Sequence, residues 1–275
     1  LPGCEPVYTV YDAADRPVFT QDGNQRAKGE WSFSIPDAFS RIVLTGTCKN
    51  VFDYTANPLG SNVVTAAWSN GSTALKGYSV KGITLTAPVV LSANYYDDYE
   101  FLGKNGIPDD ATTGYSEMSG YGKRYSGGCK GQLTGNWTAR LTSQLAGSTY
   151  LVMYYDDRYR VIQRKGNNSL NGMEAVYTSY NFEGSPVKEK RIHSVPGQDI
   201  ITEVRNHTYD LANRLLQTTY QLNDDAPVIL VDNVYDEIGR LKTEKRTGHS
   251  KLRTDYTYNL RSWTKGINGP LFHQT

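Results

Sequence analysis

Apolar and polar residues alternate over short stretches of this 275-residue chain, a pattern typical of β-strands with half-buried side chains. The clearest example covers residues 228–243, where two alternating stretches flank a polar turn. In that turn Asp236 is placed to accept a hydrogen bond from the amide two residues on, and Gly239 to adopt a positive φ. The pattern predicts a β-hairpin closed by a type I turn with a G1 bulge.

The same plan recurs six more times in degenerate form, and the fullest copies have a tyrosine and an aspartate before the turn and an arginine after it. Pro36 replaces the tyrosine in one copy, and the copy at residues 258–263 is the weakest. Asn213 and Asp15 replace the glycine, and asparagine tolerates positive φ better than most residues. Tyr159 stands at this place in another copy and leaves its turn geometry open, while the copy with Gly184 has Ser185 in place of the arginine. The repeat-motif residues are Tyr11, Asp12, Arg16, Asp37, Arg41, Tyr155, Asp156, Arg160, Tyr180, Gly184, Tyr209, Asp210, Asn213, Arg214, Tyr235, Asp236, Gly239, Arg240, Tyr258 and Trp263.

The spacing of the copies indicates one hairpin per repeat. Copies starting at residues 155, 180, 209, 235 and 258 are 25, 29, 26 and 23 residues apart. Two strands of about eight residues, a tight turn and a connector fill such a period. A variable period favours hairpins with variable outer loops over a solenoid coil. An eighth candidate, at Tyr96 and Asp97, keeps only the first two residues of the motif.

The Tyr-Asp-x-x-Gly-Arg-Leu pattern at this spacing resembles the YD-repeat, or RHS-repeat, family, over residues 7–45 and 150–267. Members are large secreted or surface chains whose hairpins wind into a spiralling β-sheet shell, which in toxin-carrying members encloses a variable C-terminal toxin. Residues 21–26 and 258–263 are similar to the version found in Bacteroidetes bacteria. The resemblance implies an all-β segment of antiparallel hairpins in a curved sheet. We also expect that sheet to be open, with at least one long unpaired edge.

Three stretches differ in pattern and are expected to form one continuous β domain. Residues 1–50 and 149–275 carry the repeats, and residues 51–148 form an irregular β segment. Within that segment residues 78–80, 83–86, 89–95 and 133–151 have strand character. Residues 103–135 contain nine glycines and predict a long loop. No helix of three turns with an apolar stripe is expected.

Composition and charge narrow the class of protein. The chain has 21 Tyr against 7 Phe and 3 Met, which suits half-buried strands whose phenol hydroxyls reach water or backbone. A net charge of +1 from 29 basic and 28 acidic residues gives no field that would attract nucleic acid. No run of 18 apolar residues occurs, so no membrane span is expected in this portion.

The N-terminus and the cysteines leave the cellular compartment open. Residues 1–4 end in Leu-x-Gly-Cys, which resembles the end of a lipoprotein signal, but without an apolar run a linker is favoured. Cys4, Cys48 and Cys129 allow either one disulfide with one thiol left over or three thiols. Localisation, secreted or at a bacterial cell surface, therefore comes from the family resemblance.

The sequence offers no pattern for catalysis or for a cofactor. The four histidines, at 193, 207, 249 and 273, stand outside any metal-binding motif. Residues 121–128 are glycine-rich but lack the order of a phosphate-binding loop, and no nucleophile elbow occurs. Four pairs of adjacent aspartates, at 97, 109, 156 and 224, would point to opposite faces of a strand. We expect no enzyme activity, no cofactor and no metal.

Three functions remain open. The leading hypothesis is a structural segment that scaffolds, encloses or presents something encoded elsewhere in the full chain, such as a C-terminal toxin. The alternative is a carbohydrate- or surface-binding module that uses exposed tyrosines or the glycine-rich loop; the third, an enzyme, would need a cleft with convergent polar groups. For the motif residues we favour structure, with tyrosines packed across strands and each arginine bonded to its turn aspartate and stacked on a neighbouring tyrosine ring. The self-cleaving signature of toxin-carrying members is not present, so the chain is expected to be part of a longer one.

Overall fold

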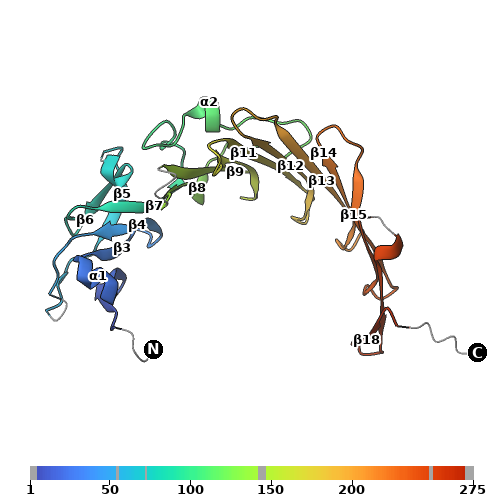
Figure 1. Ribbon diagram of the computed structural model, residues 1–275, viewed down its shortest axis with the longest axis horizontal. Coiled ribbons are helices and arrows are strands. Elements are labelled where there is room, and N and C mark those ends of the chain that lie inside the picture. The colour runs from blue at the N-terminus through green and yellow to red at the C-terminus, as the bar shows by residue number, and fades with distance from the viewer. Residues whose placement is uncertain (1–4, 54–55, 72, 142–146, 248–249, 270–275) are drawn as a thin grey trace, which may run out of the picture. The chain divides into compact units, whose positions relative to one another are not determined.

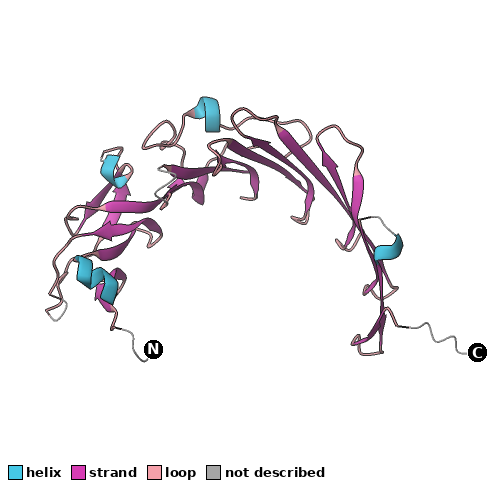
Figure 2. Cartoon of the chain, in the orientation of Figure 1, coloured by secondary structure: helices cyan, strands magenta, loops and turns pink. Residues whose placement is uncertain are grey.

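The computed structural model describes residues 5–53, 56–71, 73–141, 147–247 and 250–269, and these residues are almost entirely β-structure. Helical segments are confined to short pieces, coloured cyan in Figure 2: α1 (Gly23–Lys28), α2 (Asp110–Thr113) and the 3₁₀ turns η1 (Thr73–Leu75) and η2 (Ser250–Leu252). The predicted all-β fold is therefore confirmed.

Sixteen of the described strands form one antiparallel sheet whose strand order follows the chain (Figure 1). The strands are β1 (Tyr8–Tyr11), β2 (Pro17–Gln21), β3 (Trp31–Pro36), β4 (Ile42–Cys48), β7 (Val89–Asp97), β8 (Cys129–Ala139), β9 (Ser148–Tyr155), β10 (Val161–Asn167), β11 (Met173–Tyr180), β12 (Pro186–Ser194), β13 (Ile201–Tyr209), β14 (Leu215–Leu222), β15 (Val228–Tyr235), β16 (Leu241–Arg246), β17 (Arg253–Tyr258) and β18 (Thr264–Ile267). The strands β5 (Thr65–Trp68) and β6 (Tyr78–Lys81) pair separately.

The large sheet is open, as expected, because β1 and β18 stand at opposite ends of its strand order and do not pair with each other. A long unpaired edge is not found among the described residues. Each of these two end strands is only four residues long. Short edge strands offer few free backbone groups to another chain, which limits edge-to-edge pairing.

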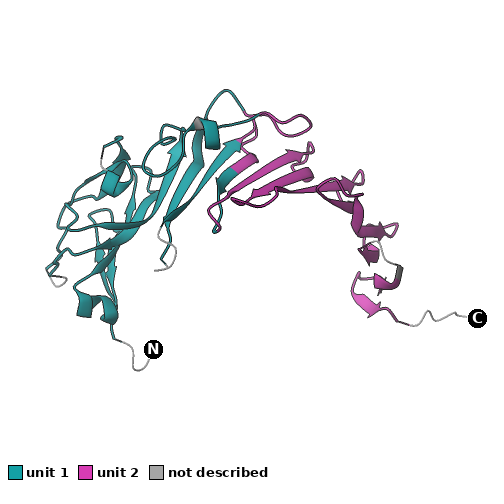
Figure 3. Cartoon of the chain, turned by 45° about the horizontal axis from the view of Figure 1, so that its top comes forward, with its two compact units in different colours: residues 1–116, 125–154, 165–169 teal, residues 117–124, 155–164, 170–275 magenta. Residues whose placement is uncertain are grey.

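The chain divides into two compact units, coloured separately in Figure 3. Unit 1 comprises residues 1–116, 125–154 and 165–169, and unit 2 comprises residues 117–124, 155–164 and 170–275.

Unit 1 has a conventional apolar core. The side chains of Phe19, Ile35 and Leu44, from β2, β3 and β4, are completely buried. The small β5–β6 sheet packs on this unit through aromatic rings, because Trp68 lies 5.6 Å from the ring of Tyr95 on β7. Burial of such side chains contributes roughly 1.5 to 3 kcal/mol each, so this unit has its own source of stability.

Unit 2 is a succession of hairpins with little apolar core. No apolar side chain of β12 to β18 among the described residues is fully buried. Cross-strand ion pairs occupy one face instead, where Arg191 on β12 lies 2.8 Å from Glu174 and 3.9 Å from Glu203 on its two neighbours. Such pairs give each strand only modest stability of its own. Contacts between successive hairpins therefore matter more here than a shared interior.

The segment between β7 and β8 differs from the sequence-based prediction. The loop ends at residue 128, since residues 129–135 already belong to β8. Gly135 lies under a ring, because a Cβ there would stand 2.4 Å from Cζ of Phe101. The glycine therefore serves close packing in a strand. Further along, the loop contributes to unit 2, where the Gly122 amide donates to the Thr178 carbonyl oxygen at 3.2 Å.

Two other local predictions need correction. Residues 83–86 alternate like a strand but form bends with no strand pairing. Residues 21–26, similar to a family repeat string, include the start of helix α1. Asp22 caps this helix, since its carboxylate accepts from the Gln25 amide at 2.8 Å and the Gln25 side chain accepts from the Asp22 amide at 3.0 Å. This reciprocal capping box stabilises a helix too short for apolar periodicity to reveal.

Candidate functional site: the hairpin tips

The turn at Asp236 shows how one carboxylate organises a hairpin tip. The Asp236 amide donates to the Arg240 carbonyl oxygen at 2.8 Å, and the Gly239 amide donates to the Asp236 carbonyl oxygen at 2.9 Å. Asp236 Oδ1 accepts from the amides of Ile238 and Arg240, at 3.2 and 2.8 Å. Its Oδ2 accepts from Arg240 Nε at 2.6 Å, and Gly239 has φ 91°. The predicted turn, with its positive-φ residue, is confirmed.

All seven motif copies lie at hairpin tips. Besides Asp236, the aspartates of four other copies accept in the same way from the arginine four residues on: Asp12, Asp37, Asp156 and Asp210. In the two copies with asparagine, the Oδ1 atoms of Asn181 and Asn259 accept from the amides of Ser185 and Trp263, four residues on, at 2.8 and 3.0 Å. Tyr159, whose geometry the sequence left open, has φ 57° and adopts the left-handed conformation that the turn needs.

The eighth candidate does not form a tip. Asp97 is the last residue of β7, and its carboxylate accepts from both terminal nitrogens of Arg41, at 3.0 and 2.7 Å. The hydrogen bonds from Arg41 lower the pKa of Asp97, and the same contacts raise the pKa of Arg41. The side chain of Arg41 also lies 4.3 Å from the ring centroid of Tyr96. This dipeptide is thus the partner of the tip at residues 37–41.

In unit 2 three motif arginines contact the tyrosine of the following tip and so join successive hairpins. The guanidinium carbon of Arg214 lies 4.7 Å from the ring centroid of Tyr235, which starts the following tip. The Tyr235 hydroxyl donates to the Leu215 carbonyl oxygen at 3.0 Å, directly after the arginine. We call this pair of contacts the inter-hairpin clamp. It recurs between Arg160 and Tyr180 at 4.8 Å.

The third clamp joins the last two tips. Arg240 lies 4.7 Å from the ring centroid of Tyr258, whose hydroxyl donates to the Leu241 carbonyl oxygen at 2.7 Å. Arg240 also donates through Nη1 to the Asn259 carbonyl oxygen at 3.0 Å. Arg160, Arg214 and Arg240 thus stack on the tyrosine of the following repeat, whereas Arg41 lies over Tyr96, which belongs to no tip. Such cation–π contacts contribute about 0.5 to 1 kcal/mol at exposed sites.

The copy without an arginine keeps half of the clamp and replaces the rest with amides. The Tyr209 hydroxyl still donates to the Pro186 carbonyl oxygen, at 2.9 Å. In place of the guanidinium, Asn213 Nδ2 donates to the Ser185 hydroxyl at 2.8 Å, and Asn181 Nδ2 donates to Asn213 Oδ1 at 2.8 Å. Asn213 is therefore more than a residue that tolerates φ 57°. Sequence reasoning missed this second role, although Ser185 at the arginine position was a signal for it.

In unit 1, the first tip is held by a different partner. Arg16 Nη2 donates to the Val64 carbonyl oxygen at 2.8 Å, and Asp12 Oδ2 accepts from the Val64 amide at 3.1 Å. Burial favours the neutral form of Asp12, but hydrogen bonds from Arg16, Val64 and Ala14 together lower its pKa. A carboxylate held in its ionised form by fixed donors supports a turn and is poorly placed to act as a general acid.

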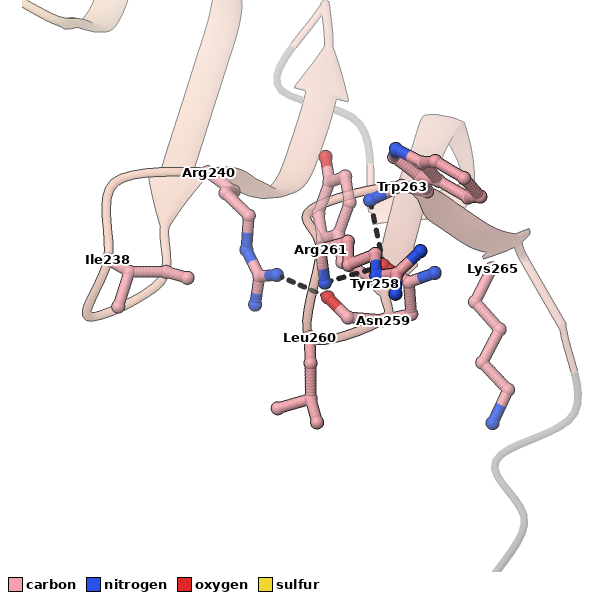
Figure 4. Close-up of a pocket in the computed structure, with 8 residues that line it drawn as sticks. All are labelled: Ile238, Arg240, Tyr258, Asn259, Leu260, Arg261, Trp263 and Lys265. Carbon is pink, nitrogen blue, oxygen red and sulfur yellow. Dashed lines mark hydrogen bonds between the residues drawn. The ribbon is translucent and has the colours of Figure 1, made fainter.

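The last two tips frame a shallow open groove of about 650 Å³ (Figure 4). Its lining residues are Ile238, Arg240, Tyr258, Asn259, Leu260, Arg261, Trp263 and Lys265. Asn259 Oδ1 accepts from the amides of Arg261 and Trp263, at 2.9 and 3.0 Å, and so fixes the turn that carries them. Trp263 occupies the place of the motif arginine and is 66% exposed. No carboxylate among the described residues lines this groove.

Other chemistry-bearing residues are used locally. His193 pairs with Glu174, and Nδ1 of His207 lies 2.9 Å from the Thr218 hydroxyl. His249 and His273 lie outside the described residues, as does Cys4. Within the described ranges no group of three or more potential metal ligands is found, and no helix there is long and apolar enough to cross a membrane. Cys48 and Cys129 are buried thiols, which excludes a bridge between these two.

Comparison with known proteins does not assign a family. No family model matches the chain, and no curated protein matches it. Among solved structures, one chain of the "Crystal Structure of TcdB2-TccC3-Cdc42" is similar, with 8% sequence identity and a TM-score of 0.28. The match covers 96% of this chain and 13% of that chain. Because similarity at this level carries no functional argument, the YD-repeat resemblance still depends on the motifs themselves.

Proposed function

We propose that this chain is a non-catalytic structural segment of a secreted or cell-surface bacterial YD/RHS-repeat protein. It scaffolds, encloses or presents a partner or toxin domain encoded elsewhere in the full chain. The observation that carries the proposal is the inter-hairpin clamp. Motif arginines and tyrosines contact each other between one hairpin and the next, as in arrays stabilised by nearest-neighbour contacts. The motif aspartates hold the arginine of their own tip in place.

The sparse apolar core of unit 2 supports the same function. A sheet whose described strands β12 to β18 bury no apolar side chain fully gains little from its own interior. Such a sheet is suited to a scaffold that is stabilised further by contacts with the domain it surrounds or supports. A catalytic unit would instead need convergent polar groups held by a rigid interior.

The carbohydrate-binding alternative receives little support at the motif tyrosines. Tyr180, Tyr235 and Tyr258 each have a guanidinium over the ring and a hydroxyl donated to backbone. A sugar platform needs an open ring face, and here one face is already used. We therefore place these tyrosines in the structural framework.

Cross-linking of the complete protein, isolated from its own bacterium, tests the proposal. Lys188, Lys190 and Lys245 lie on strands of unit 2 and accept a lysine-reactive cross-linker. We expect mass spectrometry to find links from these lysines to parts of the protein outside residues 1–275. The same reaction on residues 1–275 alone is the control. Links confined to this segment in the complete protein would contradict a scaffolding role.

A further inference from the structure

Four successive hairpin tips of unit 2 expose a large apolar side chain at the centre of the turn. Phe182 is 82% exposed, Ile238 is 69% exposed, and Leu211 and Leu260 are fully exposed. We call these four residues the apolar rim. Central turn positions normally carry polar or small residues, and contiguous exposed apolar groups on a protein surface mark contact sites. Phe182, Leu211 and Leu260 occupy the first central position of their turns, and Ile238 occupies the second. A single exposed leucine needs no explanation, but one large apolar residue at the centre of each of four successive tips does.

Strand order puts the rim on one edge of unit 2. The four tips join β11 to β12, β13 to β14, β15 to β16 and β17 to β18, and all of these pairs are antiparallel neighbours. Alternate connections in such a sheet fall on the same edge. Because neighbouring strands are about 4.8 Å apart, successive tips are about 10 Å apart. The rim is thus a regular row that a continuous peptide segment can follow.

Charge indicates what kind of segment fits at the end of the row. Arg261 and Lys265 line the groove beside Leu260, and no carboxylate among the described residues lines it with them. Figure 4 shows Ile238 and Leu260 extending from neighbouring tips, with Arg240 between them. Arg240 is neutralised by Asp236 at 2.6 Å, which leaves Arg261 and Lys265 as the cationic groups available to a ligand. A separate hollow beside the same tip is lined by Asp236 and Glu237 together with Lys242, so its charge is mixed, unlike that of the groove beside Leu260.

From this arrangement we propose that the apolar rim binds a protein segment carrying large apolar residues next to carboxylates. The apolar side chains would pack against Leu260, Ile238 and the exposed ring of Trp263. The carboxylates would pair with Arg261 and Lys265 at the periphery of this contact. Aromatic and arginine side chains surrounded by aliphatic ones are typical of the energetically dominant part of a protein–peptide contact. This inference stands independently of the scaffolding proposal.

Fluorescence anisotropy with labelled synthetic peptides tests the proposal directly on residues 1–275. Four peptide classes of equal length are compared: leucine with glutamate, leucine with lysine, serine with glutamate, and leucine with serine. We expect the leucine–glutamate class to bind most tightly, by about tenfold over the others. Its affinity should fall as salt rises from about 0.05 M to about 0.5 M, because surface charges are then screened. Equal binding of all four classes would overturn the proposal.

Variants locate the contact. Leu260→Ser and the double variant Arg261→Glu with Lys265→Glu should each weaken leucine–glutamate binding by about tenfold. Leu141→Ser is the matched control, since Leu141 is also highly exposed but lies in unit 1. All three sites are on the surface, so circular dichroism is expected to be unchanged. Full binding by the Leu260→Ser variant would overturn the assignment of the site.

Two further measurements separate this partner from other apolar surfaces. Vesicles of phosphatidylcholine with one-fifth phosphatidylglycerol should not co-sediment with the protein. Sedimentation velocity should show no self-association through the apolar rim. Self-association through the rim would be recognised by its loss in the Leu211→Ser variant. If the protein bound vesicles but no peptide, the partner would be a membrane. If it associated with itself through the rim and bound no peptide, the partner would be a second copy of the chain. Either result would overturn the proposal.

Discussion

Asn213 and Gly239 occupy equivalent positions with positive φ, of 57° and 91°, yet they contribute to stability in different ways. At Gly239 both the backbone and the space oppose a side chain, since φ is positive and a Cβ there would lie 2.6 Å from Arg214 Nη1 of the preceding tip. At Asn213 the side chain decides, because its amide bonds to both Ser185 and Asn181. Replacing either residue therefore tests a different contribution.

Gly239→Val is expected to lower the free energy of unfolding by about 2 kcal/mol, because a β-branched residue is strained at this φ. Asn213→Gly should cost about 1 kcal/mol, since glycine relaxes the backbone while two hydrogen bonds are lost. Denaturant midpoints of the two variants measure this order. Gly184→Val is the control for strain alone, as φ there is 96° and a Cβ added to Gly184 would have no other atom within 4 Å. A larger effect of Asn213→Gly would contradict the assignment.

Arg214→Lys tests whether the clamp depends on the guanidinium or on charge alone. Lysine keeps the positive charge but loses the planar group that stacks on Tyr235 and donates to Asp210. We expect a loss of about 1 kcal/mol in unfolding free energy. Arg246→Lys is the matched control, because Arg246 is exposed and its ion pair within the described part of the chain is with Glu244 on its own strand. Equal effects of the two substitutions would argue against a specific clamp.

At the scale of the element, the stability of each hairpin depends on the ionised aspartate at its tip, so low pH should destabilise the hairpins. A hydrogen bond from the Arg214 amide lowers the pKa of Asp210, although desolvation opposes it. Desolvation acts in the same opposing sense at Asp236, where hydrogen bonds from Arg240 still lower the pKa. A carboxylate whose pKa is lower in the folded state than in the unfolded chain stabilises the fold at pH values above its unfolded-state pKa of about 3.9. This stabilisation is lost as the pH falls through the lower, folded-state pKa.

These carboxylates are therefore expected to leave the denaturant midpoint of residues 1–275 nearly unchanged between about pH 7 and 5. When the pH is lowered below about 4, the midpoint should decrease. The variant Asp210→Asn removes one titrating group and should give a shallower fall. His207 adds a smaller effect at higher pH, because burial lowers its pKa and protonation then opposes folding. A midpoint that rises on acidification would contradict the role assigned to the aspartates.

At the same scale, the hairpins show what local sequence could and could not predict. The tips were predictable, because turn chemistry at Asp236 and Gly239 is encoded within a few residues. The identity of the clamp partner was not, since the distance from Arg240 to Tyr258 depends on which strands pair. Helix α1 was missed because its six residues are stabilised by a cap and bury no side chain. Residues 83–86 were wrongly predicted as a strand because alternation cannot reveal whether a pairing partner is available.

For the whole molecule, the two units should differ in stability. Unit 1 has buried side chains such as Phe19 and Leu44, whereas β12 to β18 have no fully buried apolar side chain among their described residues. We expect amide hydrogen exchange to be slowest in β3, β4 and β7 and faster in β13 to β18. Mass spectrometry of exchanged peptides measures this difference. Uniform protection across the chain would show that it unfolds as one cooperative unit.

The clamp also has a consequence for the history of the gene. Each clamp in unit 2 involves only one hairpin and the next, so loss or gain of one whole repeat leaves every other clamp intact. Unequal recombination between similar DNA stretches adds or removes such units. A change in copy number is then tolerated more readily than a shift of a few codons, which would separate an arginine from its tyrosine. We therefore expect related arrays to differ in length by whole repeats.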